Sequence, residues 1–237
     1  MHSFRSEQLQ LEKRLEAARG ERERARGELT SLEALQKAAL THDAGKATEW
    51  LDGAGLSKRQ RVAEALEVDS GWERAVETAL GDYLEAVCVD RLDEHAGTLE
   101  GFSKGRVTLI ESESAAATQA TETLAAKVRG PAAVVAQLSR VFTAETLAQA
   151  LGNREALAAG HSIITRSGEW VGRGWLRINR GADHHAGVIE REHRLKSLRQ
   201  TVAVAEERVS EAEANLAAVR DSLARGESER DQVQSGI

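Results

Sequence analysis

The candidate nucleophile of this sequence is Ser103, which stands in the run GFSKG (101–105) and so matches the pattern G-x-S-x-G. In hydrolases this pattern forms a strained turn between a strand and a helix, which exposes the serine hydroxyl. Here the surrounding residues predict the reverse order, with a helix before the serine and a strand after it. We interpret the run as a glycine-bounded loop, so a small hydrolase that uses Ser103 is the disfavoured alternative.

Histidines near the end of the middle region raise the question of a metal site. His184 and His185 are adjacent, Asp183 precedes them, and His193 follows. A metal centre needs three or four ligands that converge from spaced positions, and these histidines have no second convergent pair. A phosphate-binding glycine loop is also missing. The sequence therefore predicts no metal, no cofactor and no catalytic centre, which means that this chain is not expected to be an enzyme.

Basic residues gather toward the end of the middle region and just beyond it. They are Arg166, Arg173, Arg177, Arg180, Arg191 and Arg194. The first four fall within 15 residues, where Glu169 is the only acid and Trp170 and Trp175 are interleaved. Such a strip can follow a phosphate backbone while indole rings stack on unpaired bases, so contact with single-stranded or double-stranded DNA is one hypothesis. The alternative is a solvated strand edge whose arginines deter unwanted pairing.

The single cysteine and the lack of long apolar runs limit the cellular compartments in which the protein is expected. Cys88 lies in an apolar run and is expected to be a small core residue. One cysteine cannot form an intramolecular disulfide, which suits a reducing cytoplasm. No run of about 18 apolar residues is present to span a membrane, and the N-terminal residues lack the apolar core of a secretory signal. We expect a cytoplasmic protein that does not enter a membrane.

The composition divides the 237 residues into three parts that must position these side chains. Seven of the eight aromatic residues and the single proline, Pro131, lie between residues 50 and 175. Charged residues make up 30% of the sequence, and the two flanks have the composition of long helices around a globular middle. The formal net charge of −6 excludes a polycation, so contact with nucleic acid would need a local basic patch.

The flanks carry heptad repeats, the pattern of a coiled coil. From residue 195 onward, apolar or small residues recur in steps of three and four. They are Leu195, Leu198, Val202, Ala205, Val209, Ala212, Leu216, Val219 and Leu223. The N-terminal flank repeats the pattern less cleanly, with core positions at Leu11, Leu15, Ala18, Arg22, Ala25, Leu29 and Leu32. Leu35 and Ala39 continue out of phase, which predicts a stutter before residue 40.

Each flank has about 45 residues, or roughly 65 Å of helix. Equal lengths favour an intramolecular antiparallel coiled coil, in which the second helix runs back beside the first. A parallel homodimer of separate coils is the alternative. The prediction is an outgoing helix over 1–47, a globular domain over 48–188 and a returning helix over 189–237.

The first half of the globular domain alternates helix and strand patterns. Three glycines within 41–56 predict a break between elements, after which 57–68 and 71–87 favour helices. The apolar run 86–90 predicts a buried strand, 91–102 favours a helix, and 105–111 favours a second strand. These elements form a first lobe of about 48–115.

The second half begins with 114–128, a helix or a loose connector. Pro131 suits the first turn of a helix through 132–142, and 143–158 is also expected to be helical. The best strand region is 161–181, with a hairpin turn at Ser167-Gly168. Gly172 and Gly174 predict a bulge or a close backbone approach. The second lobe is about 125–188, so the fold class is α/β (α+β), two small similar lobes inserted at the tip of the coiled coil.

Four sequence blocks resemble the hinge of SMC chromosome-maintenance ATPases. The block VAEALEVDSGWERAVETALGDYLEAVCVD (62–90) resembles the opening of a bacterial SMC hinge, and GRVTLIE (105–111) resembles the strand that closes its first lobe. HSIITRSGEWV (161–171) resembles the hairpin of the second lobe, and HAGVIEREHRLKSL (185–198) resembles the exit into the returning coiled coil. The resemblance covers essentially the whole chain and is strongest to the proteobacterial type.

This resemblance implies a homodimerisation hinge of a protein that acts in chromosome condensation and segregation. In the family, two hinges join through edges of both lobes. The corresponding residues here are Gly105, Val107, Leu109, Gly172, Gly174, Leu176 and Gly181. DNA contact would lie near the coiled-coil junction, and the location would be the nucleoid. ATPase heads and a kleisin partner would belong only to the full-length protein.

One departure from the family pattern falls at the end of the second lobe. Family hinges often carry a Gly-Gly pair there, whereas residues 178–181 of this chain keep only Gly181.

A third alternative for the function, beside the dimerisation hinge and the hydrolase, is a passive coiled-coil spacer with a stabilising cap. It predicts a monomer without affinity for DNA.

Overall fold

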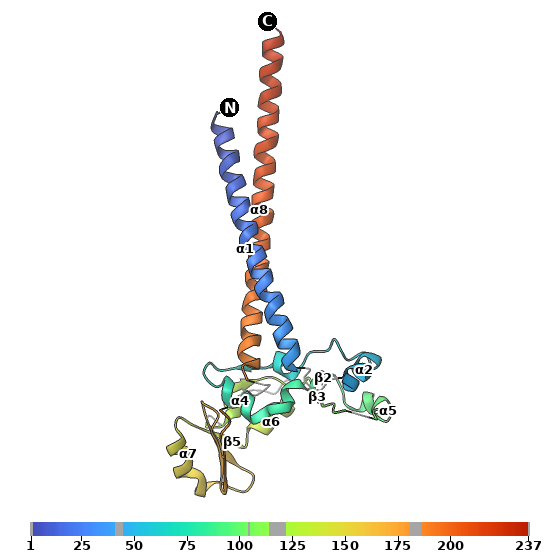
Figure 1. Ribbon diagram of the computed structural model, residues 1–237, viewed down its shortest axis with the longest axis vertical. Coiled ribbons are helices and arrows are strands. Elements are labelled where there is room, and N and C mark those ends of the chain that lie inside the picture. The colour runs from blue at the N-terminus through green and yellow to red at the C-terminus, as the bar shows by residue number, and fades with distance from the viewer. Residues whose placement is uncertain (1, 41–44, 104, 114–121, 181–185, 237) are drawn as a thin grey trace. The chain divides into compact units, whose positions relative to one another are not determined.

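The computed structural model describes residues 2–40, 45–103, 105–113, 122–180 and 186–236 (Figure 1). The chain divides into two compact units, residues 1–34 with 194–237, and residues 35–193. The first unit consists of two long helices, and the second contains every strand of the described residues.

The first unit is an antiparallel coiled coil. Its helices, α1 (His2–Leu40) and α8 (Val188–Ser235), lie side by side (Figure 1). All the predicted seam positions on α8 are buried or half-buried, and so are those on α1 from Leu11 to Leu32, with Arg22 included. Leu15, Val209 and Leu216 lie at the centre of the apolar cluster between the helices. The predicted intramolecular antiparallel pairing is confirmed, and the alternative of separate coils is wrong.

Ion pairs join the two helices at every heptad of this coiled coil. The described pairs on one flank of the seam are Arg5–Glu227, Glu12–Arg220, Arg19–Glu213, Arg26–Glu206 and Glu33–Arg199. Their shortest N···O distances lie between 2.5 and 3.2 Å. Both members of each pair are substantially exposed, so each contributes little to stability alone, but their regular recurrence fixes which residues face each other.

The predicted stutter in α1 is wrong. The buried or half-buried positions continue without interruption as Leu29, Leu32, Gln36 and Ala39, while Leu35 is 59% exposed. Gln36 occupies a core position because both the nitrogen and the oxygen of its side-chain amide are hydrogen-bonded. Its Nε2 donates to Val188 O at 2.9 Å, and its Oε1 accepts from Arg191 Nε at 3.1 Å. Hydrophobicity alone assigned the core position to Leu35. The structure places the hydrogen-bonded Gln36 there instead, so the heptad repeat continues without a stutter.

The described residues of the second unit form three small sheets. Strands β2 (Val87–Val89) and β3 (Leu109–Glu111) pair in parallel, and β1 (Glu67–Val68) pairs antiparallel with β4 (Val128–Arg129). The third sheet has the order β5 (Val141–Ala144), β6 (Ser162–Thr165), β7 (Trp170–Gly172), β8 (Trp175–Arg177). Its β5–β6 pair is parallel and its other two pairs are antiparallel. The predicted hairpin at Ser167-Gly168 joins β6 to β7, and Gly168 has the positive φ of +86° that its turn requires.

Short helices alternate with these strands along the chain. The α-helices are α2 (Gly45–Gly53), α3 (Val62–Ala65), α4 (Glu73–Leu80), α5 (Ala96–Leu99), α6 (Ala132–Leu138) and α7 (Leu147–Asn153). The 3₁₀ helices are η1 (Gly81–Glu85), η2 (Asp93–His95), η3 (Leu124–Lys127) and η4 (Arg154–Ala156). The largest apolar cluster takes Leu40 from the end of α1 and Val188 and Ile189 from the start of α8. The last residues of α1 and the first residues of α8 therefore contribute to the core of the second unit.

The predictions for two regions of the second unit are wrong. The break expected over 41–56 contains α2, because Leu51 is buried against Leu56, Val87 and Val89, and this packing outweighs the low helix propensity of the glycines. The helices expected over 132–142 and 143–158 are separated by strand β5, which the structure pairs with β6. Among the described residues, no helix is long and apolar enough to cross a membrane.

Candidate functional site

The first candidate surface is the open edge of strand β8. This strand ends its sheet and pairs only with β7 among the described residues. Its Trp175 and Leu176 are 48% and 46% exposed, and Ile178 just beyond it is 42% exposed. An apolar strand edge with unpaired backbone groups is a template for pairing with another chain. The predicted interface residue Leu176 therefore lies on an edge suited to association.

Two glycines precede β8, and the structure gives them different roles. A Cβ atom built on Gly172 would lie 2.1 Å from Trp175 Nε1, whereas one built on Gly174 would meet nothing within 4 Å. Trp175 packs edge-on against Trp170 with ring centroids 5.5 Å apart. Gly172 therefore provides the close approach that the sequence predicted, and the indole of Trp175 fills the space left by its missing side chain.

The predicted residues of the first lobe lie on or before strand β3. Gly105 has a φ of +106°, and Val107 and Leu109 are half-buried against an apolar cluster that contains Val87 and Val89. In its two-stranded sheet, β3 pairs only with β2 among the described residues. The remaining predicted interface residue, Gly181, lies outside the described residues. The structure thus provides a second strand edge, less exposed than that of β8.

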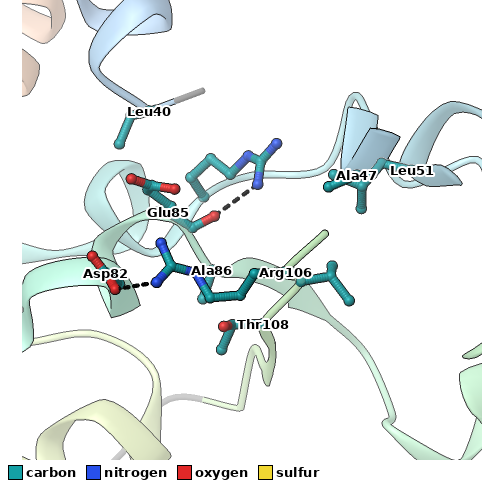
Figure 2. Close-up of a pocket in the computed structure, with 10 residues that line it drawn as sticks. Leu40, Ala47, Leu51, Asp82, Glu85, Ala86, Arg106 and Thr108 are labelled. Carbon is teal, nitrogen blue, oxygen red and sulfur yellow. Dashed lines mark hydrogen bonds and ion pairs between the residues drawn. The ribbon is translucent and has the colours of Figure 1, made fainter. Parts of the chain in front are cut away.

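A cavity of about 40 Å³ lies beside the start of this segment, lined by residues that include Leu40, Arg61 and Arg106. Figure 2 shows the Arg106 guanidinium directed toward Asp82, with which it forms an ion pair. Arg61 Nη1 donates to Glu85 O at 2.7 Å. Burial lowers the pKa of the Arg61 guanidinium. Both arginines are thus engaged by the lobe itself, and we assign no ligand to this cavity.

Most of the predicted DNA-binding arginines have partners within the chain. Arg166 forms an ion pair with Glu145 and lies over the Trp72 ring, and Arg177 lies over the Trp170 ring. The other pairs are Arg180–Glu169, Arg191–Gln36 and Arg194–Glu28. Arg173, in the turn between β7 and β8, is exposed and has no hydrogen-bond or ion-pair partner in the described ranges. The structure therefore does not gather these arginines into one free basic strip.

The remaining reactive residues occupy ordinary structural positions. Ser103 lies in an exposed loop after α5 and before β3, so the strand–turn–helix of a nucleophile elbow is not formed. Asp183, His184 and His185 lie outside the described residues, and the described ones contain no cluster of three potential metal ligands. Cys88 is buried in β2, where burial raises the pKa of its thiol.

A polar network at the start of α8 was missed by the sequence reasoning. Glu77 on α4 is only 3% exposed, and its carboxylate accepts hydrogen bonds from Gly187 N and Ile189 N, each at 3.0 Å. Burial raises the pKa of this carboxyl, although the two backbone N–H groups and the charges of Arg74 and Arg191 oppose the rise. A carboxylate at a helix N-terminus satisfies free N–H groups and complements the helix dipole. The available signal was a glutamate on the buried face of a short helix.

Comparisons with known proteins identify a domain with this arrangement. Residues 57–153 match a protein family described as "SMC proteins Flexible Hinge Domain". The chain is 39% identical over 204 residues to the chromosome partition protein Smc of Coxiella burnetii, covering 85% of this chain and 18% of the relative. It is 40% identical over 158 residues to the Smc protein of Xanthomonas oryzae pv. oryzae, covering 67% of this chain and 14% of that protein. This chain therefore spans less than a fifth of the length of either relative.

The fold also has a solved counterpart. The SMC hinge domain of Geobacillus stearothermophilus, crystallised as an asymmetric dimer, aligns with a TM-score of 0.64 at 20% identity. The alignment covers 94% of this chain and 99% of the other. The similarity confirms the expected hinge fold, with its mixture of helices and sheets beside a coiled coil.

Proposed function

Since this chain belongs, through residues 57–153, to the flexible hinge domain family of SMC proteins, we propose that it joins two copies of itself through the strand edges of β8 and β3. The complete protein would act in chromosome partition, as the names of its relatives state for them. Its ATPase heads and kleisin partner would involve parts of the protein outside this chain, and its location would be the nucleoid.

The exposed apolar edge of β8 carries this proposal. Trp175, Leu176 and Ile178 would become buried on association, and the unpaired backbone groups of the strand would gain hydrogen-bond partners. A contact that repeats identically in both copies closes as a dimer and stops there. The β3 edge supports the same geometry, because each copy would then offer one edge from each lobe.

Replacement of Leu176 by aspartate tests the edge directly. We expect the unaltered chain to be a dimer at about 10 µM by sedimentation equilibrium and the Leu176→Asp variant to dissociate at least about 100-fold more readily. The expected loss corresponds to a charge buried without a partner at the centre of an interface. Leu9→Asp is the matched control, since Leu9 is 55% exposed on α1 of the coiled-coil unit. An unaltered chain that is monomeric at this concentration would contradict the proposal.

We propose a narrower DNA contact than the sequence suggested, carried by the β7–β8 hairpin. Arg173 is free of intramolecular partners in the described ranges, and Arg177 is exposed above Trp170. Reversing both charges, Arg173→Glu with Arg177→Glu, is expected to weaken binding of a single-stranded oligonucleotide. The slope of log binding constant against log salt concentration should become smaller by the contribution of about two ionic contacts. The same double substitution at the paired residues Arg194 and Arg199 is the control. An unchanged salt dependence in the hairpin variant rejects this contact.

A further inference from the structure

We propose that Arg74 and Glu77 form a clamp that couples the β8 edge to the first turn of the returning helix α8. The two side chains lie three residues apart on helix α4, and Arg74 Nη1 is 3.9 Å from Glu77 Oε2. This inference rests on the proposed dimerisation through β8, and it concerns how that edge communicates with the start of α8.

The clamp holds both ends of the segment that joins β8 to α8. Arg74 Nη2 donates to Asn179 O at 3.3 Å, two residues beyond the end of β8 at Arg177. Glu77 accepts from Gly187 N and Ile189 N at the beginning of α8. A displacement of either end therefore moves one of these two side chains, and the ion pair between Arg74 and Glu77 passes the movement to the side chain that holds the other end.

Further hydrogen bonds restrict the movement of the first turn of α8, which Glu77 binds. Arg191 Nη1 donates to Ala186 O at 3.0 Å, while Gln36 binds both Val188 O and Arg191. The Glu77 carboxylate is almost fully buried, so an N–H group that it releases would not be rehydrated without a local opening. Packed elements of this kind tend to adopt discrete arrangements, which is the condition for transmitting a change between two sites.

The test measures two quantities on the full 237-residue chain: amide hydrogen exchange at Gly187 and Ile189, and the dimer dissociation constant. Glu77→Gln removes the charge and leaves one of the two N–H groups without an acceptor, so exchange at these amides is expected to be about tenfold faster. The same variant is expected to weaken the dimer about fivefold through coupling, although the described contacts of Glu77 include no residue of β8.

Arg74→Met supplies the reciprocal measurement. It removes the bond to Asn179 while keeping the aliphatic stem, and it is the safer variant for folding, since Arg74 is already 28% exposed. We expect a weaker dimer and also faster exchange at Gly187, an amide that Arg74 does not contact. Glu73→Gln is the matched control on the same helix, because the described bond of Glu73 goes to Gly71 N; neither quantity should change.

The outcomes separate this inference from the proposed function. A dimer constant unchanged in both clamp variants, with faster exchange in Glu77→Gln, would mean that Glu77 is a local helix cap and would overturn the coupling. Unchanged exchange in Glu77→Gln would overturn the clamp itself. If the unaltered chain is monomeric, the proposed dimerisation fails and the coupling fails with it. If the unaltered chain is dimeric and the dissociation constant is unchanged in both clamp variants, only the coupling is refuted.

Discussion

A Gly172→Ala variant is expected to lose about 2 kcal/mol of unfolding free energy and most of its ability to dimerise. The added methyl would lie 2.1 and 2.2 Å from ring atoms of Trp175, far inside contact distance. A rigid indole cannot yield as a flexible chain end would, so Trp175 must leave its position against Trp170 and the β7–β8 hairpin must distort. Overpacking of this kind costs roughly 1–3 kcal/mol. Urea unfolding measures the stability, and sedimentation equilibrium measures the dimer.

The matched control is Gly174→Ala, two residues along the same turn. A Cβ there would meet no atom within 4 Å, so its stability should change by less than about 0.5 kcal/mol, the usual range for a surface substitution. If both variants lose the dimer equally, the effect comes from general stiffening of the turn and not from the Trp175 contact. A stable, fully dimeric Gly172→Ala chain would show that the hairpin geometry does not control association.

Periodicity made the coiled coil and the second-lobe hairpin predictable from the sequence. The heptad positions from Leu195 to Leu223 all lie in the seam, because a repeat of three and four residues leaves only one face to bury. The β6–β7 hairpin was predictable because Ser167-Gly168 separates two apolar runs and only glycine easily adopts the positive φ of that turn. A sequence pattern is sufficient where it specifies the face that a helix buries or the turn that joins two neighbouring strands.

Features that depend on distant partners were not predictable in this way. Gln36 became a core residue only through its bonds to Val188 and Arg191, more than 150 residues away in the chain. Glu77 likewise depends on the first amides of α8, and β5 is identified by its parallel pairing with β6. DNA contact by the predicted arginines stays a prediction, but the intramolecular partners of these arginines were not predictable either. Arginines that are close in sequence were drawn to separate partners such as Glu145 and Glu28.

The charges of the coiled coil specify its register. At the five heptad-spaced pairs, α1 presents Arg, Glu, Arg, Arg and Glu in chain order, and α8 presents the opposite charge each time. Sliding one helix by a heptad in either direction would place like charges together in three of the four remaining pairs. The apolar seam alone would tolerate such a slip, because its pattern repeats every seven residues. Charge order therefore selects one alignment, while apolar burial supplies the stability.

That division of roles predicts a large effect for Val209→Asp. Val209 is 4% exposed in the centre of the seam, so the substitution buries a carboxylate without a partner and is expected to cost about 3 kcal/mol or more. Val204→Asp on the same helix is the control, since Val204 is 41% exposed and should tolerate the change.

All four tryptophans lie in the other unit, residues 35–193. Helix ellipticity at 222 nm should therefore melt at a lower temperature in Val209→Asp while the tryptophan fluorescence transition stays in place. A fall in both signals together would contradict separate folding of the coiled coil, and an unaltered ellipticity transition would contradict the burial of Val209 in the seam.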